Sequence, residues 1–211
     1  MGTFIDAATW FVLGYFVLLN LGYFGLNVLA ITSLLRNSQE RLLEELPQAY
    51  SGLEPSISVL MPAFNEQATI VASVRSMLQL TYADFEGIVI NDGSRDATLD
   101  VLREAFALEP FPESYATRLP TQPVRAVYRS TIHPNLPVID KENGGKAGSL
   151  YGGINGGRHP LFCGVDADSV LERDSLQRVV KPFLREPHMV ASGGTVRVAN
   201  GCAVRDGHLL S

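Results

Sequence analysis

The stretch SISVLMPAFNE, residues 56–66, joins a run of strand-forming apolar residues to an abrupt polar end. A short apolar run of this kind, bounded by turn-forming residues, is typical of a buried strand. The segment that follows, 67–80, has the spacing of an amphipathic helix, and FEGIVINDG, residues 85–93, repeats the strand pattern. A strand, a helix and a second strand in this order predict a parallel βαβ unit.

The same alternation continues toward the C-terminus. Further strands are expected at VRAVYRS (124–130), LFCGVD (161–166) and HMVASGGTVRV (188–198), and helices at 96–107, where Asp96 is the expected cap, 146–157 and 172–185. Two irregular segments, 108–123 and 130–145, are expected to form a surface insertion and a loop that covers a binding rim. The predicted fold class is therefore α/β, a mainly parallel, Rossmann-like sheet with helices on both faces.

The N-terminal segment is too apolar for this domain. Between Asp6 and Arg36 lie 29 consecutive uncharged residues, and about 20 helical residues are enough to cross a bilayer core of about 30 Å. A cleaved signal peptide is not favoured, because residues 1–6 contain no Lys or Arg and no small-residue cleavage site follows. We therefore expect a transmembrane anchor at 1–36, a juxtamembrane helix and linker at 37–55, and one domain at 56–211.

Charge at the end of the anchor predicts its orientation. Arg36 and Arg41 follow the apolar segment, and the positive-inside rule then places the domain in the cytoplasm, on the inner (plasma) membrane. Gly22, Gly25 and Asn27 are candidates for contact with partner transmembrane helices.

Overall composition excludes some classes of function. The net charge is −5 and the pI is near 5.4, with no run of Lys or Arg, which argues against a nucleic-acid-binding surface. The two cysteines, Cys163 and Cys202, lie far apart and in no metal-binding pattern. We expect Cys163 to be a small core residue in a strand.

Polar clusters follow three of the predicted strands. They are PAFNE (62–66), NDGSRD (91–96) and DADS (166–169). Ligands of open parallel sheets bind outside the carboxyl ends of the strands. The three clusters are therefore expected to lie along one rim of the sheet and to form one site.

The D-x-D pair, Asp166 and Asp168, has two interpretations. Paired carboxylates beside a strand end can hold a hard cation such as Mg²⁺, which takes one or two protein carboxylates together with the oxygens of a substrate diphosphate. The alternative is a solvated turn, with Asp168 or Ser169 capping a helix that begins near Leu171.

Two other segments can also contact a nucleotide. Asp92 can accept a hydrogen bond from a base N–H or a ribose hydroxyl, although Asn-Asp-Gly-Ser is also ordinary turn chemistry. Lys146 follows a glycine pair and precedes a helix, so its ammonium and the free backbone N–H groups can meet phosphate oxygens. A Walker A motif is excluded, because Asp140 and Ala147 stand where Gly and Ser or Thr are required. The glycine run at 152–157 has no explanation in the sequence.

The ordered motifs PAFNE, VINDGSRD, GGKAGSL and VDADS, behind an N-terminal apolar helix, resemble the inverting family 2 glycosyltransferases of the GT-A fold. Among these, the chain looks most like the membrane-embedded bacterial β-glycan synthases, the group of cellulose, hyaluronan and poly-N-acetylglucosamine synthases. The resemblance covers about residues 56–200. It implies a UDP-sugar donor, a glycan or lipid-linked acceptor, and Mg²⁺ or Mn²⁺ as cofactor.

The resemblance also implies roles for individual residues. Asp92 resembles the aspartate that contacts uracil and ribose. Asp166 resembles the first D-x-D aspartate, near the ribose and metal, and Asp168 resembles the metal ligand. Ala63, Phe64 and Glu66 match the motif lining the nucleoside pocket, and Lys146 matches the lysine beside the nucleotide.

The chain departs from the family at two places. Tyr151 stands where the family often has Asn, and no E-D or Q-x-x-R-W motif occurs before Ser211. The catalytic base is therefore expected beyond Ser211; Glu172 and Asp174 follow the D-x-D too closely, and Asp206 is a remote candidate. We expect this fragment to hold the donor half of the site and, alone, to transfer no sugar.

Two alternative functions remain open. One is a single-transfer enzyme acting on a polyprenyl-phosphate lipid, although such enzymes usually carry their membrane helices after the catalytic domain. The other is a non-catalytic, membrane-tethered nucleotide-binding module, which needs the three aspartates but no base. A nucleotidyltransferase is disfavoured, because PAFNEQAT, not a glycine-rich loop, follows the first strand.

Overall fold

The computed structural model describes residues 2–44, 54–112, 115, 117–196, 203–205 and 208–210. The chain divides into two units, Met1–Ser51 and Gly52–Ser211. The first contains one helix, α1 (Gly2–Glu44), and its segment Ala8–Ser33 is long and apolar enough to cross a membrane. The separate juxtamembrane helix predicted within 37–55 is, as far as Glu44, a continuation of α1.

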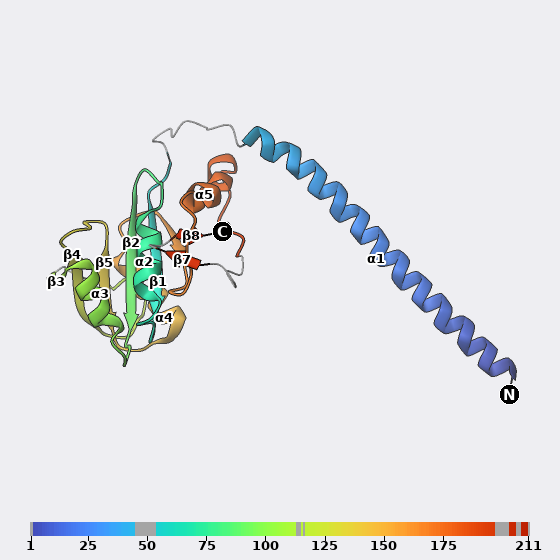
Figure 1. Ribbon diagram of the computed structural model, residues 1–211, viewed down its shortest axis with the longest axis horizontal. Helices are drawn as coiled ribbons and strands as arrows, with labels where there is room; N and C mark the ends of the chain where they lie inside the picture. Colours follow the sequence, from blue (N-terminus) through green and yellow to red (C-terminus); the bar gives the residue numbers. More distant parts are fainter. Residues whose placement is uncertain are drawn as a thin grey trace. The chain divides into compact units, whose positions relative to one another are not determined.

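The second unit is built on a six-stranded sheet with the order β3-β4-β5-β2-β1-β6 (Figure 1). The strands are β1 (Ile57–Ala63), β2 (Phe85–Asp92), β3 (Leu108–Pro110), β4 (Val124–Ser130), β5 (Pro137–Lys141) and β6 (Leu161–Gly164). Strands β5, β2, β1 and β6 run parallel to one another, and β4 and β3 continue the sheet antiparallel. A separate hairpin joins β7 (Ala203–Arg205) and β8 (His208–Leu210).

Helices cover both faces of this sheet. They are α2 (Ile70–Leu78), α3 (Thr98–Phe106), α4 (Gly145–Gly156) and α5 (Ser175–Arg185). One buried core joins the sheet to α2, α3 and α5 through residues such as Met77, Phe106 and Val180. A smaller core on the other face packs α4 against Leu60 and neighbouring strand residues. The predicted fold class, a mainly parallel sheet with helices on both faces, is confirmed.

The predicted helices are all present with shifted ends. Ala97, not the predicted Asp96, is at the N-cap position of α3. The Asp96 carboxylate nevertheless accepts a hydrogen bond from the Thr98 backbone N–H at 3.0 Å, so it satisfies one free amide of that helix. Cys163 lies in β6 and packs against the larger core, as predicted. Burial raises the pKa of its thiol.

The segment 124–145 was predicted wrongly in two respects. Strand β4 is antiparallel to its neighbours, because only six residues, 131–136, separate it from β5, and a parallel crossover needs a dozen or more. Strand β5 lies inside the segment expected to be a loop. Its Asp140 and Lys141 look like loop residues in the sequence, but both are buried and paired with other side chains.

The strand predicted at 188–198 is also wrong over its described part, 188–196, which contains no strand. Val190 and Val196 are each 92% exposed, so these β-branched residues have no sheet to pack on. Gly193 and Gly194 interrupt the run with two residues that disfavour a strand interior.

The glycine run of α4 has a packing role. A Cβ atom at Gly153 would lie 3.0 Å from both Ile90 Cδ1 and Leu60 Cδ2, and one at Gly156 would lie 2.7 Å from Ile139 Cδ1. These contacts are tighter than a side chain can normally make, so glycine lets α4 lie close to the sheet. The close approach places the first turn of α4 beside the ends of β2 and β5.

Candidate functional site

Four parallel strands end along one rim of the sheet. Ala63 of β1 is in register with Asn91 of β2, and Asp92 of β2 with Lys141 of β5. Just past β6, the Val165 N–H donates to the Leu60 carbonyl at 2.9 Å, which continues the alignment. The three polar clusters predicted to converge therefore follow adjacent, parallel strand ends.

The loops after β1 and β2 are hydrogen-bonded to each other. Asn65 has a left-handed backbone conformation, with φ of 57°. Its N–H donates to Ser94 Oγ at 3.0 Å, and its Oδ1 accepts from the Arg95 N–H at 2.8 Å. The Glu66 N–H donates to Thr98 Oγ1 at 2.8 Å. These contacts make one platform, which we call the β1–β2 platform, from residues 64–67 and 94–98.

Asp96 strengthens this platform. Its carboxylate accepts from the Thr98 hydroxyl and N–H and from the Gln67 N–H. Partial desolvation by itself raises the pKa of Asp96, but the hydrogen bonds to Thr98 and Gln67 outweigh it and hold the pKa below its usual value. A charged carboxylate therefore ties the start of α3 to the loop after β1.

Three predicted nucleoside-pocket residues lie in or beside the platform. Ala63 is buried at the end of β1, whereas Phe64 is 45% exposed. The Glu66 carboxylate accepts from the Thr69 hydroxyl at 2.7 Å and is partly buried. An exposed ring beside an exposed polar loop can stack on a planar ligand such as a nucleobase.

Asp92 is more enclosed than the sequence indicates. It is 3% exposed, and its Oδ1 accepts from Lys141 Nζ at 2.5 Å and from the Gly144 N–H at 3.0 Å, while Oδ2 accepts from the Gly145 N–H at 2.8 Å. The backbone amides of 144 and 145, expected to be free for phosphate, are therefore bound by this carboxylate. A carboxylate offers about four acceptor positions, so one on Oδ2 remains for a ligand.

The other predicted charged residues meet at the far end of the rim. Lys146 Nζ lies 2.5 Å from Asp166 Oδ1, and the two side chains are 67% and 57% exposed. Asp168 is also exposed, while Ala167 between the two aspartates is 4% exposed. The chain thus buries the middle residue of the D-x-D and presents both carboxylates to solvent.

The alternative explanation of the D-x-D, a solvated turn that caps a helix, holds for the turn but not for the cap. Helix α5 begins at Ser175 with Asp174 at the N-cap position, so neither Asp168 nor Ser169 adjoins it. Instead, the Ser169 N–H donates to the Asp166 carbonyl at 3.0 Å and closes a turn. The two carboxylates therefore have no capping function that explains them.

The residues of the D-x-D fit a hard divalent cation. Carboxylate oxygens are the ligands that Mg²⁺ prefers, and a nucleotide site usually supplies only one or two of them. In the part of the chain that the structure describes, no group of three or more His, Cys, Asp or Glu could hold a metal by itself. Asp166 and Asp168 therefore match a shared site, in which diphosphate oxygens complete the coordination.

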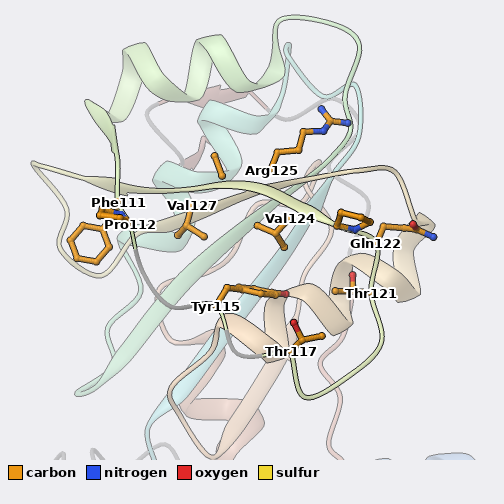
Figure 2. A pocket seen from close by; sticks show the side chains of 11 residues that line it. Phe111, Pro112, Tyr115, Thr117, Thr121, Gln122, Val124, Arg125 and Val127 are labelled. Atoms are coloured by element: carbon orange, nitrogen blue, oxygen red, sulfur yellow. The ribbon is translucent and has the colours of Figure 1, made fainter.

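A separate cavity of about 440 Å³ lies beside this rim. Figure 2 shows Tyr115, Thr117 and Thr121 on one side of it and β4 residues on the other. The Tyr115 hydroxyl donates to the Gly152 carbonyl at 2.8 Å, which joins the cavity wall to α4. None of the predicted site residues lines the cavity. The chemistry-bearing residues of this chain are therefore on the open rim.

Lys141 is a site residue that sequence reasoning missed. Its side chain is 0% exposed, and it contacts Asp92 at the rim. The run PVID before it contains the β-branched residues typical of a strand. Its Pro and Asp, and the Lys that follows, instead favoured a loop in the prediction. The predicted base candidate Asp206 lies outside the described residues.

Comparisons with known proteins agree on the kind of enzyme. A poly-beta-1,6-N-acetyl-D-glucosamine synthase of Staphylococcus epidermidis is 27% identical over 149 residues, and one of Staphylococcus aureus (strain COL) is 26% identical over the same length. These matches cover 70% of this chain and 30% of the relatives. The chain therefore spans about 30% of the length of the curated relatives it matches.

Solved structures similar to the chain include a mannosyltransferase from Pyrobaculum calidifontis in complex with GDP-Man and Mn²⁺. It is 20% identical, with a TM-score of 0.49, over 70% of this chain and 39% of that one. The S. aureus TarS fragment 1–349 in complex with UDP-GlcNAc is also 20% identical, with a TM-score of 0.44, over 63% of this chain and 32% of that one.

A family model matches a similar share of the chain. The model described as glycosyl transferase family 2 matches residues 58–118 and 120–208. These ranges contain the β1–β2 platform, Asp92, Lys146 and both aspartates of the D-x-D. Since they cover well over half of the sequence, the chain belongs to glycosyl transferase family 2.

Proposed function

We propose that this chain forms the donor-binding half of a membrane-anchored glycosyltransferase that transfers a sugar, with inversion, from a UDP-sugar to a growing glycan. The observation that carries the proposal is the group of exposed charges at the rim. Lys146 contacts Asp166 there, Asp168 is exposed two residues further along, and Asp92 binds the two residues that precede Lys146. Two carboxylates and an ammonium at one place match a cation and a diphosphate that bind together.

Each group has a distinct role in this proposal. Asp166 and Asp168 hold Mg²⁺ or Mn²⁺, and the bound cation neutralises charge that develops on the departing UDP. Lys146 contacts phosphate oxygens. Asp92 accepts from the uracil or ribose, and the β1–β2 platform, with Ala63, Phe64 and Glu66, lines the nucleoside pocket. We assign the base that deprotonates the acceptor to no residue of this chain.

The relatives support the choice of substrate. Those found are named poly-beta-1,6-N-acetyl-D-glucosamine synthases, which favours an N-acetylhexosaminyl or hexosyl donor and a glycan acceptor. Because the chain covers about 30% of those relatives, we propose the transfer activity for the whole enzyme and not for this chain alone.

The apolar helix supports a membrane location. The segment Ala8–Ser33 is long enough to span a bilayer, and its side chains are exposed along its whole length. An exposed apolar surface of this size needs lipid or another helix to cover it. We propose that α1 anchors the enzyme in the inner (plasma) membrane, with the catalytic unit in the cytoplasm, as Arg36 and Arg41 indicate.

The experiment is a calorimetric titration of UDP into the full chain in detergent, with and without Mn²⁺. We expect Mn²⁺ to strengthen UDP binding at least tenfold, and Asp168→Asn to remove most of that gain. Asp174→Asn is the control, because Asp174 is an aspartate of the same segment that lies at the start of α5 and pairs with Arg178. Equal UDP affinity with and without Mn²⁺, in the wild type and in D168N, would show that the metal assignment is wrong.

A further inference from the structure

Lys141 is a buried ammonium with two partners. Its side chain is 0% exposed, and Nζ donates to Asp92 Oδ1 at 2.5 Å and to the Glu142 carbonyl at 2.6 Å. Removing an ammonium and a carboxylate from water is energetically unfavourable, and proteins with well-packed apolar residues in their place are often as stable or more stable. The pair therefore needs an explanation other than the stability of the fold.

Helix α4, which lies over Lys141, is held in place without it. The hydroxyls of Tyr115 and Thr121 donate to the Gly152 and Gly148 carbonyls at 2.8 and 2.9 Å. Gly153 also rests directly on the strand residues of the smaller core. These contacts fix the middle and the end of α4. The position of this helix does not require a charged residue at 141.

The ion pair does fix the turn that precedes α4. Asp92 receives the Gly144 and Gly145 N–H groups on its carboxylate, and its own carbonyl accepts from Asn143 Nδ2 at 2.9 Å. Glycine is favoured at 145 by the left-handed backbone, with a φ of 73°, and at 93 by the close packing, because a Cβ there would lie 2.8 Å from the Asn143 backbone N. The next residue is Lys146, whose ammonium contacts Asp166.

We propose that Lys141 is a positioning residue for the donor nucleotide, an inference that rests on the proposed function. Its ammonium balances the charge of Asp92 and orients that carboxylate. Asp92 in turn holds residues 143–145 and therefore the place where α4 begins. Without Lys141, the Asp92 charge is buried and uncompensated beside the two amides, and the turn loses the arrangement that presents Lys146 and the remaining Asp92 acceptor position to UDP.

The test compares UDP binding by the wild type with binding by Lys141→Met, which keeps the length of the side chain and removes its charge. Titrations with Mn²⁺ at 10 °C report the dissociation constant and the stoichiometry separately. An unfolded fraction lowers the stoichiometry, whereas a misplaced turn weakens the dissociation constant. We expect the dissociation constant for UDP to rise at least tenfold in K141M. Lys181→Met, which makes the same charge change on α5, is expected to leave it unchanged.

Two further measurements complete the test of Lys141. Binding of Mn²⁺ alone, which uses Asp166 and Asp168 after β6, is expected not to weaken in K141M, and it strengthens if the displaced turn draws Lys146 away from Asp166. In the wild type without nucleotide, the Gly144 and Gly145 amides are expected to exchange with solvent at least a hundredfold more slowly than unprotected amides. This hydrogen-exchange measurement on the wild type tests the proposal if K141M does not fold.

The outcomes separate the two proposals. If the wild type does not bind UDP, the proposed function fails, and the role of Lys141 fails with it. If the wild type binds UDP and K141M binds it with the same dissociation constant, only the role of Lys141 is overturned. Unprotected Gly144 and Gly145 amides in the wild type would also overturn it.

Discussion

At the rim, the Lys146 ammonium and a bound divalent cation compete for the same carboxylate. The Lys146 ammonium contacts Oδ1 of Asp166, and Asp166 is also a proposed ligand of the divalent cation. Two positive charges cannot share that carboxylate without repulsion, and both are attracted by a diphosphate. At the scale of single residues, cation and nucleotide binding are therefore expected to support each other, because the diphosphate draws the ammonium away from the carboxylate.

This arrangement predicts effects of opposite sign for Lys146→Met. The affinity for Mn²⁺ alone is expected to rise roughly three- to tenfold, because a competing charge is removed from a solvent-exposed site. The affinity for UDP is expected to fall, because a phosphate contact is lost. Paramagnetic resonance of free Mn²⁺ and calorimetry measure the two quantities. If K146M and the wild type bind Mn²⁺ alone equally well, with K181M as the charge-matched control, the ammonium does not compete.

The elements are positioned by close packing rather than by helix propensity. Helix α4 contains Gly148, Gly152, Gly153 and Gly156 within twelve residues, a composition that disfavours an isolated helix. Gly153 and Gly156 allow it to approach the sheet, and the approach brings its first turn to Asp92. The weakness of the helix by itself is therefore offset by contacts with the sheet.

Alanine substitutions separate these two effects. Gly153→Ala places a methyl group 3.0 Å from Ile90 and Leu60, and overpacking of this kind costs about 1–3 kcal/mol in the free energy of unfolding. Gly148→Ala has open space around its Cβ, and it is expected to stabilise α4 by up to about 1 kcal/mol. Denaturant unfolding of the two variants tests the comparison. Equal stability of G153A and G148A would contradict close packing as the reason for the glycine run.

The sequence pattern was sufficient to predict the elements that depend only on residues near each other in the chain. Strands β1, β2 and β6 are apolar runs that end in polar turns, and the rim they form was predicted because parallel strands end together. Strand β5 was missed because Asp140 and Lys141 become compatible with burial only through Asn91 and Asp92, which lie about 50 residues earlier. The sequence does not show such pairing, nor that Asp92 binds the turn at 143–145.

The opposite end of the sheet also contains a buried charged residue. Glu86 accepts from Ser58 Oγ at 2.7 Å and from the Arg158 N–H and Nε at 2.7 and 3.0 Å. Burial by itself raises the pKa of Glu86, but the hydrogen bonds from Arg158 and Ser58 outweigh it and hold the pKa below its ordinary value of 4.5. This network joins β1 and β2 to the segment that leads into β6, so it stabilises the second unit as a whole.

The stability of the whole unit is therefore expected to depend on pH. A carboxylate with a lowered folded-state pKa stabilises the fold above its unfolded-state pKa, and the contribution is lost as the pH falls through the folded-state value. Glu86→Gln is expected to cost about 2 kcal/mol at pH 7 and to make the unfolding free energy less steep in pH below about 4.5. Urea unfolding at pH 7, 5 and 3.5 measures this, and parallel pH curves for the two proteins would contradict the assignment.

We propose that the nucleotide binds at the rim formed by the ends of β1, β2, β5 and β6, and amide hydrogen exchange with and without UDP and Mn²⁺ shows where it binds. The predicted result is slower exchange in the segments 63–67, 91–97, 142–148 and 164–170, with no change along 121–127, which lines the separate cavity. Protection confined to 121–127, or none at 164–170, would show that the nucleotide does not bind at this rim.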